Sequence, residues 1–157
     1  VMKYNNLIIA RTLSKFYGLP GLRVGFGFIG AGHDMFLSYC NKYLGYNRFS
    51  EAVALAALES DDHYRNVADK MEWDRQLFKK ELGNLPGFKV YKSCANFILI
   101  KYPTAIKDEL KKAMAEQDYK IKFMSDKGLE DCLRITLGRP EQIQVVVDTI
   151  KRCATAK

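Results

Sequence analysis

The first apolar positions of the chain follow two different patterns. Residues Leu7 to Ala10 form a continuous apolar run, which is typical of a strand that is buried on both faces of a parallel sheet. From Val24 to Phe28, large apolar residues alternate with Gly25 and Gly27, so one face of this segment carries side chains and the other is bare backbone. The two patterns predict two strands joined by a turn that contains glycine and proline.

Helical periodicity follows these strands. One helix is expected from Asp34 to about Leu44, and a second, capped by Ser50, runs to Leu58. A longer amphipathic helix is expected from Asp61 to Leu82, with Gly83 closing its C-terminal end. The first half of the chain is therefore predicted to combine strands and helices.

The turn Leu85 to Gly87 separates this half from a second pattern. We place a domain boundary there, between residues 1–84 and 85–157. The second part predicts a small α+β unit. Its strands are expected at 89–91, 96–100, 121–123 and 133–137, with helices at about 106–114 and from Pro140 onward.

Composition and charge restrict the class of protein. Hydrophobic residues make up 48% of the chain and charged residues 27%, and no run of 18 apolar residues occurs, so we expect a soluble cytoplasmic protein without a membrane span. The net charge is +7, but the lysines are spread along the chain, and no nucleic-acid partner is expected. Cys40, Cys94, Cys132 and Cys153 form no C-x-x-C pair, so we expect reduced thiols and no metal site.

The segment from Gly25 to Gly30, GFGFIG, matches the dinucleotide-binding pattern G-x-G-x-x-G. That fingerprint requires a strand before its first glycine and a helix that begins at its third. Here the strand alternation continues through the glycines, and loop residues follow Gly30. We therefore interpret the glycines as small residues at a place where the strand approaches another backbone, and not as a nucleotide site.

Lys15 lies where the first strand has ended and the turn begins. A lysine amine that is readily deprotonated can form a Schiff base with pyridoxal phosphate and then move a proton on the substrate. Burial at the strand end and the fixed charge of Arg23 would both favour the neutral amine. Arg23 would also bind the cofactor phosphate, and Thr12 and Ser14 would add hydroxyl donors. The residues alone leave open that Lys15 and Arg23 are ordinary surface charges.

Three segments, in order along the chain, resemble one known family. The segment from Thr12 to Gly25, T-L-S-K-F-Y-G-L-P-G-L-R-V-G, resembles the lysine segment of the fold type I, class I/II aminotransferases, which use pyridoxal 5'-phosphate. Two later segments resemble small-domain strands of the histidinol-phosphate aminotransferase branch: S-C-A-N-F-I-L-I from Ser93 to Ile100, and D-C-L-R-I-T-L-G-R-P-E-Q from Asp131 to Gln142. The resemblance thus spans nearly the whole chain.

The resemblance implies an α/β fold, namely the C-terminal part of a pyridoxal-phosphate-dependent transferase. Residues 1–84 would be the end of the large mixed-sheet domain that binds the cofactor, with the interdomain helix, and residues 85–157 the small α+β domain. It further implies that Lys15 is the catalytic lysine and that Thr12, Ser14 and Arg23 bind the cofactor together with it.

The resemblance also implies that Arg134 binds the substrate's carboxylate or its phosphate end. Where the histidinol-phosphate branch usually has a second arginine, this chain has Lys122, which would supply a point charge in place of a two-pronged donor. Lys122 therefore casts doubt on histidinol phosphate itself as the substrate.

The function implied is amino-group transfer between an amino acid or amino-alcohol phosphate and a 2-oxo acid in amino-acid biosynthesis, by a homodimer when complete. A decarboxylase of the same fold, similar to threonine-phosphate decarboxylase, remains an alternative, as does an inactive structural fragment. The family's N-terminal half, which holds the aspartate facing the pyridine nitrogen and the aromatic residue stacked on the ring, is missing from this chain. We therefore expect the isolated chain to be inactive.

Overall fold

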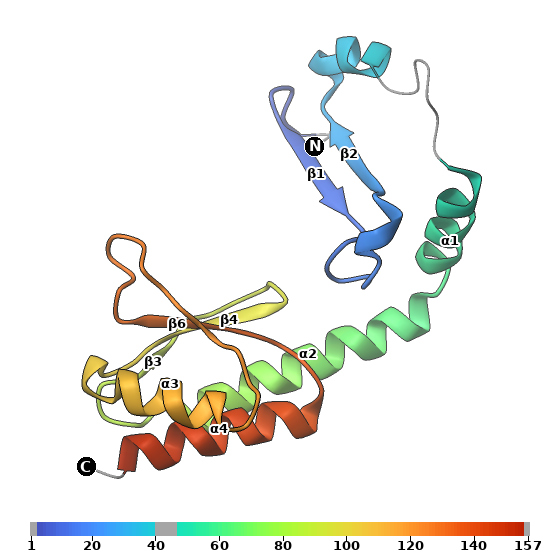
Figure 1. Ribbon diagram of the computed structural model, residues 1–157. Helices are drawn as coiled ribbons and strands as arrows, with labels where there is room; N and C mark the ends of the chain where they lie inside the picture. The colour runs from blue at the N-terminus through green and yellow to red at the C-terminus, as the bar shows by residue number, and fades with distance from the viewer. Residues whose placement is uncertain (1–2, 40–46, 156–157) are drawn as a thin grey trace. The chain divides into compact units, whose positions relative to one another are not determined.

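The computed structural model describes residues 3–39 and 47–155, and it divides into two compact units, Val1–Arg65 and Asn66–Lys157 (Figure 1). The division falls inside helix α2 (Asp61–Leu82), earlier than the boundary expected near residue 85. It falls there because Phe78 and Leu82 of α2 are buried in the core of the second unit. For the complete protein the boundary at residue 85 stays a prediction.

Strands β1 (Ile8–Thr12) and β2 (Gly25–Ile29) of the first unit form a two-stranded antiparallel sheet. The parallel pairing predicted for the first strand is wrong for the chain as described, and burial of that strand in the complete domain stays a prediction. The described residues give β1 one neighbour, which is antiparallel, and all five of its residues are exposed. Ile8 and Ile9 accordingly keep 47% and 37% of their surface exposed.

The glycines of β2 lie within the strand, as the alternating pattern predicted. A Cβ added at Gly25 would lie 3.0 Å from the carbonyl oxygen of Arg11, and one added at Gly30 would lie 2.4 Å from that of Tyr4. A side chain at either position would crowd the neighbouring backbone. The close-approach interpretation is confirmed at Gly25 and Gly30. The loop expected after Gly30 is wrong, since a 3₁₀ helix begins at Ala31, but the first two glycines lie inside the strand, where a dinucleotide fingerprint needs a turn.

Two predicted helices of the first unit differ from the structure. The helix expected from Asp34 is a 3₁₀ helix, η2 (Ala31–Tyr39), with non-helical backbone at His33; its expected end near Leu44 lies outside the described residues. Helix α1 (Arg48–Leu58) is capped by Asn47 and not by Ser50. The Asn47 side-chain oxygen accepts the N–H groups of Phe49 and Ser50 at 2.9 and 3.2 Å, so Ser50 already belongs to the first turn.

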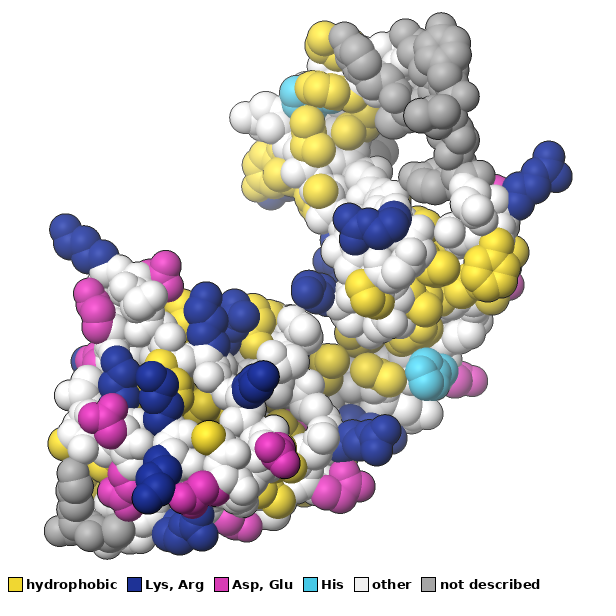
Figure 2. All heavy atoms as spheres, in the orientation of Figure 1, with side chains coloured by type: hydrophobic (Ala, Val, Ile, Leu, Met, Phe, Trp, Pro, Cys, Tyr) yellow, Lys and Arg dark blue, Asp and Glu magenta, His cyan; other side chains and the backbone are white. Residues whose placement is uncertain are grey.

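Apolar side chains remain exposed on the first unit (Figure 2). An open apolar groove runs between β2 and α1 and has a volume of about 470 Å³. The exposed side chains that line it are Phe26, Phe28, Leu55 and Leu58. Contiguous apolar surface of this kind is typical of a face that another polypeptide segment covers.

The second unit is the predicted small α+β unit. Its four strands are antiparallel and lie in the order β3-β4-β6-β5. Helices α3 and α4 and the second part of α2 cover one face of this sheet (Figure 1). The bounds are β3 (Lys89–Val90), β4 (Phe97–Lys101), η3 (Thr104–Ile106), α3 (Lys107–Ala115), β5 (Lys122–Phe123), β6 (Cys132–Thr136) and α4 (Pro140–Thr155).

Alternation along the two central strands decides which side chains face the helices. Ile98 and Ile100 of β4 pair with Ile135 and Leu133 of β6, and all four are buried in the core. Each such side chain contributes about 1.5 to 3 kcal/mol of transfer free energy. The intervening residues of both strands face the opposite, helix-free side.

Among the described residues, no helix combines the length and apolar character needed to cross a bilayer.

Candidate functional site

The turn that carries Lys15 is built around Leu13. The Leu13 side chain is fully buried and packs with Ala54 and Ala57 of α1. Its N–H donates to the carbonyl of Val24 at 3.2 Å, and its own carbonyl accepts from the N–H of Leu19 at 3.0 Å. This anchor holds both ends of the turn and fixes the backbone on either side of Leu13, where Thr12 and Ser14 lie.

Thr12 and Ser14 lie against each other at the start of this turn. The Thr12 hydroxyl donates to the Ser14 hydroxyl at 2.9 Å and accepts the Ser14 N–H at 3.1 Å. Two hydroxyls and a backbone amide are thereby gathered at one point. In this arrangement the Ser14 O–H is the donor left for the oxygen of an anion, and the Thr12 O–H becomes available if it turns away from Ser14.

Arg23 lies at the other end of the turn in a left-handed backbone conformation, with φ 55° and ψ 34°. This conformation costs a residue other than glycine about 1 to 2 kcal/mol. The Arg23 guanidinium makes a long bond of 3.4 Å to the carbonyl of Pro20, and none of the ion pairs among the described residues includes it. Arg23 therefore presents an uncompensated cation, as a phosphate ligand would.

Lys15 itself is exposed, and the described residues do not supply the burial expected for its amine. Its carbonyl accepts the N–H of Gly18 at 3.0 Å, which closes a tight turn at the surface. The expected desolvation is thus wrong for the chain as described. The physical reason is that β1, which leads into this turn, is exposed along its whole length.

An aromatic cluster that sequence reasoning missed lies next to Lys15. The Tyr17 ring centroid is 4.5 Å from that of Tyr64 and 5.3 Å from that of Phe16. The Tyr64 hydroxyl also donates to the Tyr17 carbonyl at 3.2 Å. Sequence reasoning did not connect Tyr64 with Lys15, although two aromatic residues directly after a candidate catalytic lysine were a usable signal. The cluster holds the backbone that follows Lys15.

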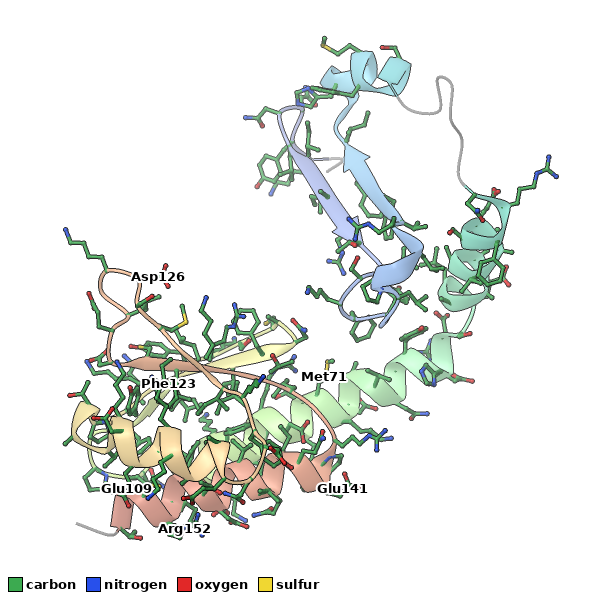
Figure 3. All side chains as sticks on the ribbon, viewed as in Figure 1. Met71, Glu109, Phe123, Asp126, Glu141 and Arg152 are labelled. Carbon is green, nitrogen blue, oxygen red and sulfur yellow. The ribbon has the colours of Figure 1, made fainter. Side chains whose placement is uncertain are left out.

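The second unit brings Lys122 and Arg134 together on the helix-free face of its sheet. The two residues are direct cross-strand partners on β5 and β6, and Leu99 of β4 is the partner of Arg134 on its other side. Phe123, next to Lys122, packs toward the helices instead (Figure 3), as strand alternation requires. The Arg134 guanidinium carbon lies 5.2 Å from the centre of the Phe97 ring.

The nearby acid, Asp131, has another partner. Its carboxylate accepts from the Lys101 ammonium at 2.5 Å. This hydrogen bond holds the pKa of Asp131 below its ordinary value and raises the pKa of Lys101. Of the ion pairs among the described residues, none includes Lys122 or Arg134. Two unneutralised cations side by side can bind an anion with a double negative charge.

The family expected from the sequence is confirmed. Residues 1–150 match the family model for aminotransferase class I and II, and the chain belongs to this family. It is similar to histidinol-phosphate aminotransferase from Roseiflexus castenholzii, with 33% identity over 159 residues that cover 95% of this chain and 41% of the relative. The chain spans less than half the length of the curated relatives it matches.

Solved structures confirm the fold class. One similar structure is histidinol-phosphate aminotransferase from Sinorhizobium meliloti, in complex with pyridoxal-5'-phosphate. The match covers 99% of this chain and 43% of the Sinorhizobium meliloti chain, with a TM-score of 0.79 and 23% identity. A second similar structure is L-threonine-O-3-phosphate decarboxylase from Porphyromonas gingivalis. The match covers 94% of this chain and 46% of the decarboxylase chain, with a TM-score of 0.73 and 26% identity. The chain has part of the mixed α/β fold of these enzymes.

Proposed function

We propose that this chain carries the lysine-bearing part of a pyridoxal-phosphate-dependent aminotransferase that acts on an anionic substrate. The observation that carries the proposal is the turn from Thr12 to Arg23. It presents an amine, two hydroxyls and an uncompensated guanidinium on a backbone that Leu13 anchors. Family membership supports the same chemistry.

The residues of this turn fit the cofactor. Arg23 would pair with its phosphate through the planar fork of the guanidinium, and the hydroxyls of Thr12 and Ser14 would donate to the remaining oxygens. The strained backbone of Arg23 supports a binding role, because strain of this kind persists where function requires it. When bound, pyridoxal phosphate would supply an electron sink for the bond that is broken at the substrate's α carbon.

Lys15 would then act as the acid and base of the reaction. Its Nζ atom would take the proton from the substrate's α carbon and return a proton two atoms further along, beyond the amino nitrogen. An amine does this only in its neutral form, so a covering segment that excludes water from Lys15 is part of the proposal.

Lys122 and Arg134 would bind the anionic end of the substrate. Arg134, held against the Phe97 ring, offers a two-pronged donor in a fixed orientation, and Lys122 adds a point charge from the neighbouring strand. Fixing one end of the substrate in this way aligns its reacting carbon. The substrates proposed are an amino acid or amino-alcohol phosphate as donor and a 2-oxo acid as acceptor, in a complete enzyme that is a homodimer.

Decarboxylation is the second candidate, and the likeness to the Porphyromonas gingivalis decarboxylase supports it. The deciding experiment uses a complete enzyme, that is, a protein as long as the curated relatives in which residues 1–157 form the C-terminal part. Amino transfer to a 2-oxo acid is measured beside release of carbon dioxide from the same donor. Transfer without carbon dioxide release supports the aminotransferase, whereas release of carbon dioxide at the rate of donor consumption refutes it.

A further inference from the structure

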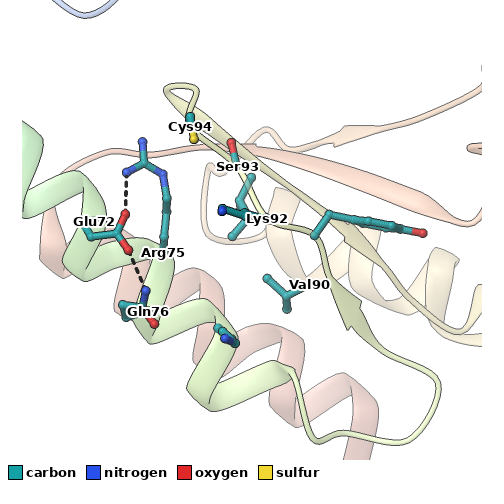
Figure 4. Close-up of a pocket in the computed structure, with 10 residues that line it drawn as sticks. Glu72, Arg75, Gln76, Val90, Lys92, Ser93 and Cys94 are labelled. Atoms are coloured by element: carbon teal, nitrogen blue, oxygen red, sulfur yellow. Dashed lines mark hydrogen bonds and ion pairs between the residues drawn. The ribbon is translucent and has the colours of Figure 1, made fainter.

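A cavity of about 450 Å³ lies on the second unit between α2 and the hairpin that joins β3 to β4 (Figure 4). It lies on the helix-covered side of the sheet, because Val90 and Ile98, which line it, face the core side. Arg134 faces the opposite side of the same sheet. The cavity is therefore distinct from the candidate substrate site, and an inference about it does not rest on the proposed function.

Positive charge dominates the lining of this cavity. Three lining residues are basic, Arg75, Lys79 and Lys92, and one is acidic, Glu72. The Glu72 carboxylate accepts from Gln76 at 2.6 Å and from Arg75 at 3.1 Å, and these two hydrogen bonds lower the pKa of Glu72. Lys79 and Lys92 take part in none of the ion pairs of the described chain. Glu72 attracts Lys92 from beyond ion-pair distance, so this single acid is shared between Arg75 and Lys92 and the lining keeps an excess of positive charge.

The walls of the cavity are held in place before any ligand arrives. Arg75 is only 15% exposed, and besides Glu72 it donates to the carbonyl of Ala95 at 2.7 Å, which ties α2 to the hairpin. The Ser93 hydroxyl donates to the carbonyl of Phe97 at 2.6 Å and accepts the N–H of Ala95 at 3.1 Å. A preformed cavity of several hundred Å³ matches the usual size of a small-molecule site.

The lining is also divided by polarity. Val90 and Ile98 form an apolar wall, and Lys79 and Lys92 supply charge from the two elements that frame the cavity. We propose that this cavity binds a small organic anion whose apolar part lies against Val90 and Ile98 and whose dianionic head, such as a phosphate monoester, is bound by the two lysines. Lysine ammonium groups bind phosphate as point charges and need no fixed geometry.

Cys94 provides a local reporter for this proposal. It lines the cavity and is exposed, whereas Cys132 and Cys153 are each 1% exposed. In the whole 157-residue chain, the rate of alkylation by iodoacetamide is followed on the Cys94 peptide by mass spectrometry. Phenyl phosphate is the probe, and benzyl alcohol is its uncharged counterpart. We expect phenyl phosphate to slow the alkylation of Cys94 in a saturable way and benzyl alcohol not to do so.

Variants assign the effect to the two lysines. The double substitution Lys79→Gln, Lys92→Gln should weaken the apparent affinity for phenyl phosphate by roughly tenfold, since it removes two partly exposed charge contacts. Lys111→Gln, Lys112→Gln on α3 makes the same change of charge outside the cavity and should leave the affinity unchanged. Equal protection by benzyl alcohol, or equal weakening by both double variants, would overturn the proposal. Circular dichroism verifies that each variant keeps its fold.

Discussion

Lys122 and Arg134 stand directly opposite each other on neighbouring antiparallel strands, and both are cations. Like charges in direct cross-strand register destabilise a sheet by up to about 1 kcal/mol. Among the described residues no carboxylate forms an ion pair with either of them. A bound anion would turn this repulsion into two attractive contacts, so the proposed substrate site can be tested by stability as well as by activity.

Removing one charge of this pair should make the free protein more stable. Lys122→Gln is expected to raise the free energy of unfolding by about 0.5 kcal/mol, because it removes the cross-strand repulsion. It should also diminish the stabilisation that added phosphate gives at constant ionic strength. Thermal unfolding followed by circular dichroism measures both effects. Lys120→Gln, outside the register with Arg134, is the control, and an equal result from it would contradict the assignment.

Arg134 is expected to anchor substrate. A charged hydrogen bond at a desolvated site contributes about 1.5 to 3 kcal/mol, so Arg134→Ala should lower kcat/KM of the complete enzyme by roughly ten- to a hundredfold. The loss should be smaller for donors that lack the anionic end. Steady-state kinetics on a matched pair of donors measures the difference. The same loss on both donors would show that Arg134 does not recognise that end.

Lys15 should be the residue that the cofactor modifies. Borohydride reduction of the complete enzyme loaded with pyridoxal phosphate is expected to fix a phosphopyridoxyl group on the peptide that contains Lys15. Lys15→Ala should abolish transfer and leave the circular dichroism spectrum unchanged, because the side chain is exposed. Lys3→Ala serves as the matched control. A stoichiometric label on a different lysine would rule out the assignment.

Asp74 is expected to make the free energy of unfolding depend on pH. Its side chain is 1% exposed, its Oδ1 atom has no hydrogen-bond partner, and burial raises the pKa of Asp74 above its ordinary value. Between the unfolded and the folded pKa the native state binds more protons, so this group destabilises the fold as pH rises through that interval. Asp74→Asn should add roughly 1 kcal/mol of unfolding free energy at neutral pH, and the gain should shrink in acid.

Urea unfolding at a series of pH values checks this expectation. Asp69→Asn on the same helix is the control, since Asp69 is exposed and its substitution should change little. A gain for Asp74→Asn that stays constant down to acid pH would mean that the carboxyl charge is not its cause.

The 157-residue chain studied alone should self-associate, bind pyridoxal phosphate weakly and show no measurable transamination. The exposed Phe26 and Phe28 of β2 favour association, as does a sheet that has only two strands among the described residues. Sedimentation velocity should show species larger than a monomer, and Phe26→Ser, Phe28→Ser should shift them toward the monomer. Steady turnover by the purified chain, with no second polypeptide detected by mass spectrometry, would refute this prediction.

Local patterns were enough to predict the elements of the second unit. Ile98 and Ile100 alternate with outward residues, and α2 runs from Asp61 to Leu82 as its apolar stripe predicted. Such signals are set by neighbouring residues along the chain. The antiparallel partner of β1 was not predicted, because a continuous apolar run does not define the direction of the adjacent strand.

The candidate site was predictable as a set of residues but not as a geometry. The motif from Thr12 to Arg23 indicated candidate cofactor ligands, which stay a prediction, and nothing in it revealed the left-handed backbone of Arg23. The register that sets Lys122 against Arg134 depends on the intervening loop, whose conformation the sequence pattern does not define. Asp74, by contrast, interrupts the stripe between Met71 and Phe78 and could have been recognised as a buried acid.

The backbone angle of Arg23 has an evolutionary consequence. At φ 55° glycine would be the more stable residue, so selection for stability alone favours a change from arginine to glycine at this position. Only a benefit that depends on the guanidinium opposes that drift. In duplicated or decaying gene copies this codon should be among the first of the turn to change, and an arginine retained there marks a lineage in which the anion-binding turn is still under selection.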